Sequence, residues 1–228
     1  MVPHDPIGHC PLFQDLEEED RAYALAYFQA TEKSYDKGAF LHHVSFPLSR
    51  FGLVLAGTVE VSMDDMDGRH LIMNRVGPGE LFGEAYCFLG IDAPIAIQAV
   101  APAQILWLSP DRVKEPQSPS QPLDQALANR FVAALAARTL AMNRRVQILA
   151  RSTLRAKVIT FLSQYAADQG DTFTIPFDRA GMASFLGADR SALSRELSKL
   201  RREGVLDYHR NRFTILRRPL SLPADTEP

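Results

Sequence analysis

The sequence predicts an α+β protein with an N-terminal antiparallel β-barrel or jelly roll, a long helix, and a C-terminal segment of short helices followed by a β-hairpin. Three observations support this prediction. Eight of the thirteen glycines lie between residues 36 and 108, among short runs in which apolar and polar residues alternate. Apolar residues then recur with heptad spacing from residue 128 to 149. Two short amphipathic segments separated by a glycine follow between residues 179 and 203.

The composition limits the class of protein. The chain has 228 residues, 46% of them apolar, which is enough to bury a core in one large domain or two ordinary ones. Its two cysteines, Cys10 and Cys87, are too few for a disulfide framework or for a four-cysteine metal cluster within one chain. We find neither a secretion signal nor a run of about 18 apolar residues. We therefore expect a cytoplasmic protein with no membrane partner.

The charge is divided unevenly along the chain. Residues 1–150 carry 12 basic and 18 acidic side chains, a net charge of −6, whereas residues 151–228 carry 13 and 9, a net charge of +4. An acidic body with a basic C-terminal segment is typical of a protein with a polyanionic partner. A basic surface that is merely solvated is the alternative.

The N-terminal part, residues 1–118, is predicted to form the β domain. In "LVLAGTVEVSM" the residues Leu53, Leu55, Val59 and Val61 alternate with smaller or polar ones, so we expect them on one face. The next strands should form a hairpin that turns at Asp67-Gly68. Before them, "LFQDLEEEDRAYALAYF" predicts an amphipathic helix packed on the barrel.

Residues 119–150 are predicted to form the long helix, after a proline-rich connection. One seam position holds β-branched residues and the other holds unbranched ones, a division that favours a parallel two-stranded pairing. The seam residues are Val132, Leu135, Thr139, Met142, Val146 and Leu149. We expect a homodimer through this seam. The alternative is a helix that covers the protein's own β domain.

Residues 151–228 are predicted to form a winged helix-turn-helix. Asp178 can cap a helix over residues 179–186, and Asp189 can cap a second over residues 190–203, with Gly187 in the turn. Three leucines share one side of the second helix, and the opposite side carries serines and basic residues but no acid. "VLDYHRNRFTIL" then alternates about Arg210-Asn211 and predicts the hairpin wing.

The exposed side of the second helix has the chemistry of a DNA-reading surface. An arginine on a helix in the major groove can contact guanine bidentately, and each such contact contributes about 1–3 kcal/mol of discrimination between bases. We expect Arg190, Ser191, Ser194 and Arg195 to read bases. We expect Lys199, Arg201 and Arg202, together with Arg210 and Arg212 at the wing tip, to contact phosphates.

Two stretches in this order resemble the Crp/Fnr superfamily of bacterial transcription regulators. "GPGELFGEA" (77–85) is similar to that family's barrel motif, and "DRSALSRELSKLRREGVLD" (189–207) is similar to its recognition helix and wing. The resemblance implies a homodimer that binds a near-palindromic promoter site, works with RNA polymerase, and switches its DNA affinity when the β domain senses a signal. Many members have a glutamate where this chain has Ser191, so its half-site should differ from theirs.

The resemblance also places an effector pocket at Leu81, Gly83, Glu84 and Tyr86. Glu84 matches the glutamate that contacts the ribose in cyclic-nucleotide binders. The arginine and serine that hold the phosphate should lie near positions 93 and 94, where this chain has Ala93 and Pro94. We therefore do not expect cyclic AMP. The oxygen-sensing members use four cysteines, so an iron-sulfur cluster is not expected either.

The recognition helix is closest to regulators of hybrid-cluster-protein and nitrosative-stress genes, some of which are thought to use haem. Haem is therefore one candidate for the signal, and a small organic ligand or redox chemistry at Cys87 are the alternatives. Candidate iron ligands are His42, His43, His70, Met73 and Cys87, although neighbouring His42 and His43 should point to opposite faces of a strand.

The sequence also bears on two other function classes. A glycine-rich barrel can also belong to a cupin metalloenzyme, which needs two or three inward histidines and an acid at fixed spacing, and no such cluster occurs in the sequence. A cyclic-nucleotide module that regulates another protein would not need the winged helix. We therefore expect a DNA-binding regulator and no enzyme.

Overall fold

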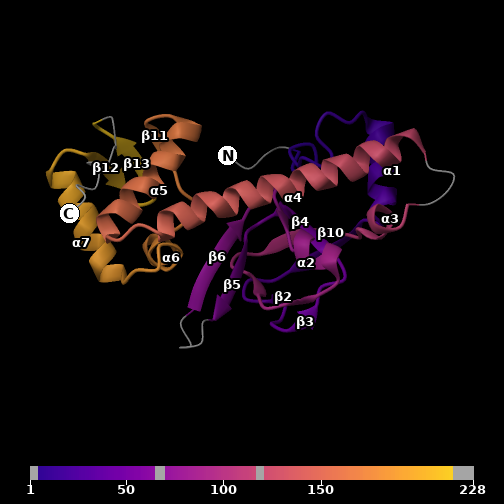
Figure 1. Cartoon of the computed structure of the whole chain (residues 1–228), viewed down its shortest axis with the longest axis horizontal. Coiled ribbons are helices and arrows are strands. Elements are labelled where there is room, and N and C mark those ends of the chain that lie inside the picture. Colours follow the sequence, from indigo (N-terminus) through magenta and orange to yellow (C-terminus); the bar gives the residue numbers. More distant parts are fainter. Residues whose placement is uncertain (1–4, 65–69, 117–120, 218–228) are drawn as a thin grey trace. The chain divides into compact units, whose positions relative to one another are not determined.

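The computed structural model describes residues 5–64, 70–116 and 121–217. It contains two compact units, residues 1–139 and 140–228, and the long helix α4 (Pro122–Leu149) contributes to both (Figure 1). The α+β prediction is confirmed. No helix in the described part of the chain is long and apolar enough to cross a membrane. The division of the chain into three domains, with boundaries at residues 118 and 150, stays a prediction.

The strands of the first unit form a jelly roll of facing sheets rather than one closed barrel, as far as the described residues show. One sheet has the order β1-β10-β4-β7 and the other β2-β9-β5-β6, with β3 and β8 as a separate pair. The bounds are β1 Thr31–Tyr35, β2 Phe40–His42, β3 Phe46–Pro47, β4 Phe51–Ala56, β5 Val59–Asp64, β6 His70–Val76, β7 Leu81–Phe82, β8 Asp92–Ala93, β9 Ala96–Ala99 and β10 Ala103–Leu108. All of the pairings are antiparallel.

Strand β4 of the first sheet is buried on both faces, which corrects one expectation. Val54 points into the core between the sheets, whereas Leu53 points into a second core under the helices. Val59 joins Val54, so Leu53 and Val59 do not share a face. The chain passes from β4 in the first sheet to β5 in the second at Gly57, which has φ +81° and whose Cβ, if present, would lie 2.1 Å from the carbonyl oxygen of Pro102. This turn separates two strands that the alternation alone joins into one.

The hairpin predicted after β5 is present as an antiparallel pair with β6, and its turn at Asp67-Gly68 lies outside the described residues. The helix predicted over residues 12–28 is shorter. It covers only Glu18–Tyr27 (α1), because residues 10–15 form turns that bury Leu12 and Phe13 in the core under the helices. The short helices α2 (Glu84–Leu89) and α3 (Asp111–Lys114) were not predicted.

One hydrogen-bonded cluster joins the helices of this unit. Tyr23 of α1 donates a 2.6 Å hydrogen bond to Asp124 of α4, and Arg112 of α3 pairs with the same carboxylate at 3.5 Å. The guanidinium of Arg112 also lies over the Tyr27 ring. Leu127 and Phe131 of α4 are fully buried beneath this cluster. One side of the first part of α4 therefore packs on its own domain. This is what the alternative to the dimer seam, a helix that covers the protein's own β domain, predicts for that side.

The second unit confirms the predicted winged helix-turn-helix. Its elements are α5 (Leu154–Gln169), β11 (Thr172–Thr174), α6 (Arg179–Phe185), α7 (Arg190–Arg202), β12 (Leu206–His209) and β13 (Arg212–Ile215). The strands form one sheet in the order β11-β13-β12, and Arg210 turns the β12–β13 hairpin with φ +54°. The core contains aromatic rings from α5, α6 and the sheet, among them Phe161, Phe185 and Phe213.

Candidate nucleic-acid interface

Helix α7 is fixed at its start and along one side. Asp189 caps it, because its carboxylate accepts a 2.9 Å hydrogen bond from the backbone N–H of Ala192. Leu193, Leu197 and Leu200 are each 0% exposed. Together they hold the opposite side of α7 in solvent, as the residue pattern predicted.

Helix α6 and the turn give α7 its orientation. Asp178 caps α6 through a 2.7 Å hydrogen bond from the N–H of Gly181. Gly187 adopts φ +61° in the turn, a conformation that favours glycine. Met182, Ala183 and Leu186 are buried at the crossing of the two helices. This is the geometry in which the second helix of the motif projects from the surface.

The residues expected to read bases lie together on the N-terminal half of α7. Arg190, Ser191 and Arg195 are exposed, and Ser194 is half-buried. The Ser194 hydroxyl donates to the carbonyl of Arg190, and the Ser198 hydroxyl donates to the carbonyl of Ser194, each at 2.9 Å. Because these two hydroxyl protons are used within the helix, the serine oxygens have only their acceptor sites left for a base.

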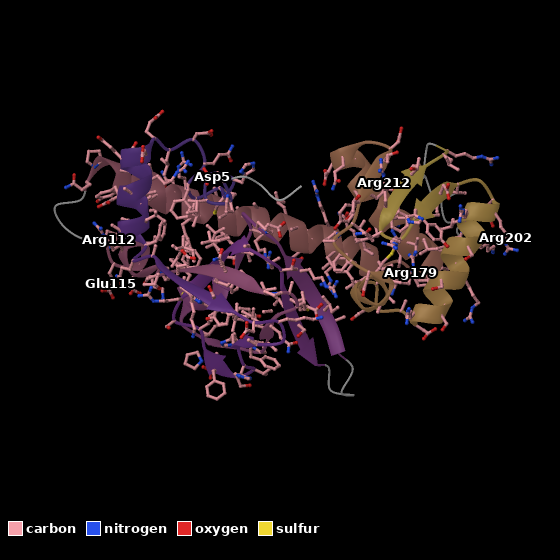
Figure 2. The ribbon with its side chains drawn as sticks, turned by 180° about the vertical axis from the view of Figure 1, so that it is seen from behind. Asp5, Arg112, Glu115, Arg179, Arg202 and Arg212 are labelled. Carbon is pink, nitrogen blue, oxygen red and sulfur yellow. The ribbon has the colours of Figure 1, made fainter. Side chains whose placement is uncertain are left out.

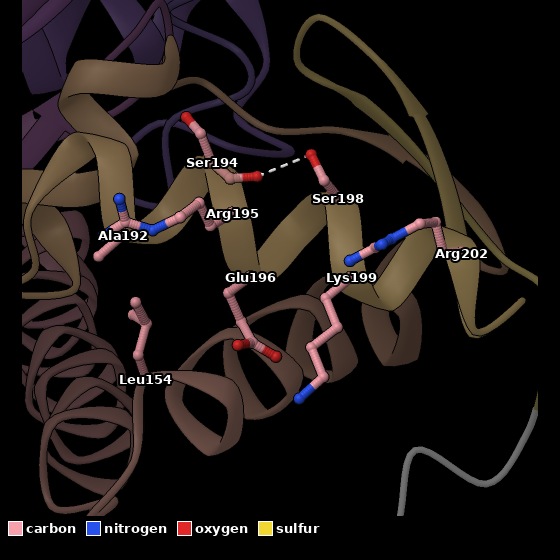
Figure 3. Close-up of a pocket in the computed structure, with 8 residues that line it drawn as sticks. All are labelled: Leu154, Ala192, Ser194, Arg195, Glu196, Ser198, Lys199 and Arg202. Atoms are coloured by element: carbon pink, nitrogen blue, oxygen red, sulfur yellow. Dashed lines mark hydrogen bonds between the residues drawn. The ribbon is translucent and has the colours of Figure 1, made fainter.

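An open groove of about 590 Å³ runs along this face of α7 and the start of α5 (Figure 3). The lining residues are Leu154, Ala192, Ser194, Arg195, Glu196, Ser198, Lys199 and Arg202. The groove brings predicted base readers and predicted phosphate contacts onto one surface. It also contains Glu196, an acid that borders the exposed face and that the helical wheel did not place there.

The side chains predicted to contact phosphates differ in their surroundings. Lys199, Arg202, Arg210 and Arg212 are exposed, and Figure 2 shows Arg202 on α7 and Arg212 on the wing strand β13. Arg201 instead forms a 2.7 Å ion pair with Asp207 and lies over the Tyr208 ring. Contact between Arg201 and a phosphate would therefore compete with this pair.

Two basic residues near the interface were not predicted. Arg179, at the start of α6, stacks on the Tyr208 ring and donates to the backbone carbonyl of Arg210 at the wing turn. Burial lowers its pKa. Arg155 of α5 contacts α7 directly. No local sequence signal marks either residue, because their partners lie about thirty to fifty positions away.

The predicted effector pocket lies at helix α2 of the first unit. Gly83 begins the helix with φ +79°, and its Cβ, if present, would lie 2.4 Å from the Cδ2 methyl of Leu48. Leu81 is buried in the core under the helices, whereas Tyr86 packs on the core between the sheets. Ala93 is fully buried. The N-terminus of α2 thus faces a leucine, and its surroundings are mainly apolar.

Glu84 has a partner within the chain. It is 4% exposed, and its Oε1 lies 3.7 Å from Nε of Arg138 on α4. Its Oε2 is buried and has no hydrogen-bond partner among the described residues. The carboxylate that would meet a ribose in a cyclic-nucleotide binder is therefore already paired with a cation from the long helix.

The candidate metal ligands do not gather in the described part of the chain, which holds no group of three or more His, Cys, Asp or Glu side chains able to bind a metal ion. His42 is buried with a lowered pKa, mainly because of desolvation, and His43 is exposed and stacks on Phe40, as strand alternation predicted. Burial raises the pKa of Cys87 to about 11. The side chain of His70 lies outside the described residues.

The predicted dimer seam of α4 is only partly exposed. Val132, Met142 and Val146 are 57%, 40% and 61% exposed, and Thr139 is exposed as well. Leu135 packs on the core under the helices, and Leu149 is half-buried. Leu140, which the seam did not include, is 64% exposed. The helix therefore covers its own domain with one side and presents apolar residues to solvent on another.

Two family models match the chain in the order that the structure shows. Residues 32–115 match the cyclic nucleotide-binding domain, and residues 156–220 match the Crp-like helix-turn-helix domain. The first covers the jelly roll, and the second covers α5 to the wing. Neither includes α4, which both the sequence and the structure make a separate feature of this chain.

Relatives cover nearly the full length. A cyclic AMP receptor protein of Thermus thermophilus is 26% identical over 197 residues, which are 86% of this chain and 88% of that protein. FixK2 of Bradyrhizobium japonicum superposes with a TM-score of 0.67 at 23% identity, over 83% of this chain and 93% of that one. The c-di-GMP-responsive regulator CLP of Xanthomonas campestris has a TM-score of 0.67 at 17% identity, over 87% and 99%.

The arrangement of a jelly roll, a long helix and a winged helix with a basic exposed recognition helix thus agrees with both domain models and with the relatives. The chain belongs to the Crp/Fnr superfamily of DNA-binding transcription regulators.

Proposed function

We propose that the protein is a homodimeric, sequence-specific transcription regulator whose jelly roll responds to a signal other than cyclic AMP. The observation that carries the proposal is the exposed face of α7, where Arg190, Ser191 and Arg195 project beside Lys199 and Arg202. Base readers at the N-terminal half of the helix and cations farther along match the way a recognition helix enters a major groove. RNA polymerase is the further partner expected of a transcription regulator.

The test of DNA recognition is a binding selection from random duplexes. A dimer with one recognition helix per protomer should select two symmetric half-sites about one helical turn apart. Arg195→Ala should relax the preference at one position of each half-site. Arg144→Ala is the matched control, since Arg144 of α4 forms an exposed ion pair with Asp168 of α5. The proposal fails if no sequence is enriched, or if the two variants behave alike.

The exposed apolar residues of α4 support the dimer. Three seam residues, Val132, Met142 and Val146, lie open to solvent on one side of α4, where a partner helix would cover them. Val146→Glu should convert the dimer to a monomer in light scattering. Ala137→Glu, at an exposed position about 180° around the helix from Val146, should leave the dimer intact.

Three features of the α2 region argue against cyclic AMP as the signal. Ala93 and Pro94 stand where the family's phosphate ligands should be, Leu48 lies against Gly83, and Arg138 pairs with Glu84. Positions 93 and 94 offer no cationic side chain to a cyclic phosphate, and the ribose would have to displace Arg138. Calorimetric titration with cyclic AMP should show no binding, and the nucleotide should leave DNA affinity unchanged. Binding that Glu84→Gln abolishes would refute this part of the proposal.

Haem remains a candidate signal because of one observation. The Nε2 atom of His42 is buried without a hydrogen-bond partner among the described residues, and the lowered pKa keeps the imidazole neutral, the form that binds iron. The absorption spectrum of the purified protein, taken before and after haem and nitric oxide are added, tests this. A Soret band that His42→Ala removes would support haem, and a flat spectrum without uptake would exclude it.

A further inference from the structure

Helix α7 has a second attachment besides its leucines. Arg155, in the first turn of α5, donates a hydrogen bond from Nη1 to Glu196 Oε1 at 3.1 Å and another from Nη2 to Glu203 Oε2 at 2.5 Å. One guanidinium thus holds two carboxylates of the recognition helix. The side chains are 34%, 19% and 37% exposed for Arg155, Glu196 and Glu203. The cluster therefore lies at the surface, where DNA can approach it.

Helix geometry makes this contact a constraint on orientation. Glu196 and Glu203 are seven residues apart, which is about two turns and about 10.5 Å along the axis, so they share one side of α7. A guanidinium has fixed, divergent N–H groups and can donate to both acids at once, whereas an ammonium is a single point charge. Arg155 therefore opposes rotation of α7 about its axis as well as movement away from α5.

The position of the two acids relates this constraint to base reading. Glu196 follows Arg195 directly and lines the same groove (Figure 3). A small rotation of α7 that moved Glu196 would move the Arg195 guanidinium with it. The pairing also counters two negative charges beside a surface that must meet a polyanion. Consistently, Arg155 lowers the pKa of the Glu203 carboxyl, so this acid stays ionised and paired.

We propose that Arg155 is a positioning residue for sequence recognition, which holds Glu196 and Glu203 so that the base-reading side chains of α7 keep their alignment. The proposal rests on the proposed DNA-binding function. Arg155 acts through α7 and is not itself a base or phosphate contact. Loss of its hydrogen bonds to Glu196 and Glu203 should therefore weaken binding to the preferred site more than binding to arbitrary DNA.

The decisive variant is Arg155→Lys, which keeps the charge and loses the two-point contact. Binding is measured by fluorescence anisotropy on the selected duplex and on a scrambled duplex of equal length. Specific affinity should fall about tenfold, the lower part of the range that one bidentate base contact contributes. Affinity for scrambled DNA should stay within about twofold, because it depends on charge. Arg144→Lys, the same change at the surface pair with Asp168, should alter neither.

Glu203→Gln tests the same inference from the other side of the contact and with a change in charge. It replaces the ion pair between Arg155 and Glu203 by a weaker hydrogen bond to a neutral group and removes one negative charge from the protein, so it should tighten binding to scrambled DNA while the ratio of specific to scrambled affinity falls. A simple charge effect would instead tighten both. This variant also keeps the inference testable if Arg155→Lys should fail to fold, which circular dichroism would reveal.

Two results would overturn the inference. An unchanged affinity ratio in Arg155→Lys and Glu203→Gln would show that the contact does not align α7. Equal losses on both duplexes in Arg155→Met, with no change in the ratio, would make Arg155 a direct phosphate contact. A wild-type protein that prefers no sequence would instead refute the proposed function itself, so the two failures are distinguishable.

Discussion

Asp189 offers a test of how local helix stability controls DNA recognition. Its side chain accepts the 2.9 Å hydrogen bond from Ala192 that satisfies one of the free N–H groups at the start of α7. Replacement of such a cap by alanine costs about 1 kcal/mol, within a range of about 0.5–2 kcal/mol. Asp189→Ala should therefore lower the free energy of unfolding of the C-terminal unit by about this amount, which corresponds to about 4–8 °C in a unit of this size.

The same loss reaches DNA binding through the first turn of α7. Arg190 and Ser191 lie in that turn, and helix ends open at low free-energy cost, so a change of about 1 kcal/mol can lower the population of the formed turn by up to about fivefold. Removal of the Asp189 charge would by itself favour DNA. Asp189→Asn loses that charge and keeps a capping acceptor, so it is the correct reference.

The assay is the specific affinity of both variants together with their melting temperatures. Asp189→Ala should bind up to about fivefold more weakly than Asp189→Asn and should melt at the lower temperature. Equal affinity and equal melting of the two variants would show that the cap does not control the reading face.

Three further predictions concern the first unit and the core. Gly52→Ala should destabilise the jelly roll by more than about 1 kcal/mol in urea unfolding, because the new Cβ would lie 2.0 Å from the Phe82 ring; unchanged stability would mean that the ring moves freely. Cys10 and Cys87 should react slowly with a thiol reagent in the native protein, since burial raises their pKa values to about 12 and about 11; rapid labelling would contradict this. Because both values exceed the ordinary 9.0, the unfolded chain loses its thiol protons first, so these two groups should lower the stability as pH rises from about 9 to about 12. Arg138→Ala should lower the stability of the first unit, because it leaves the buried Glu84 carboxylate without its cation; the double variant Arg138→Ala/Glu84→Gln should regain part of it, and its failure to do so would argue against the pair.

Local signals in the sequence predicted much of the DNA-binding unit. The caps Asp178 and Asp189, the turn glycine Gly187 and the leucine side of α7 depend on neighbours a few positions away, and each is where the pattern placed it. The β domain was less predictable. Leu53 and Val59 face different cores because β4 and β5 belong to different sheets and β4 packs on a core at each of its faces, which alternation within one segment cannot reveal.

The ion pairs of Arg155 and Arg138, on which the proposals depend, could not be predicted because each joins residues that are far apart in the sequence. Arg155 meets Glu196 and Glu203 from more than forty positions away, and Arg138 meets Glu84 from more than fifty. Nothing in the local sequence distinguishes these arginines from solvated ones. Of the residues in the predicted heptad seam, Leu135 packs on the protein's own core, and pairing through the others stays a prediction.

The segment before α1 sets a lower limit on how far the chain can be shortened. Cys10, Leu12 and Phe13 are fully buried, Arg130 of α4 donates to the backbone carbonyl of Gln14, and Pro6 and His9 lie against Gly79. A fragment that begins at residue 32, where the family model starts, would lose six side chains of the core that contains Leu81 and Cys87, namely Cys10, Leu12, Phe13, Ala24, Tyr27 and Phe28. Recombinant work on the jelly roll alone should therefore retain residues 5–31 and the α4 residues through 139, or it will measure an opened core instead of the native domain.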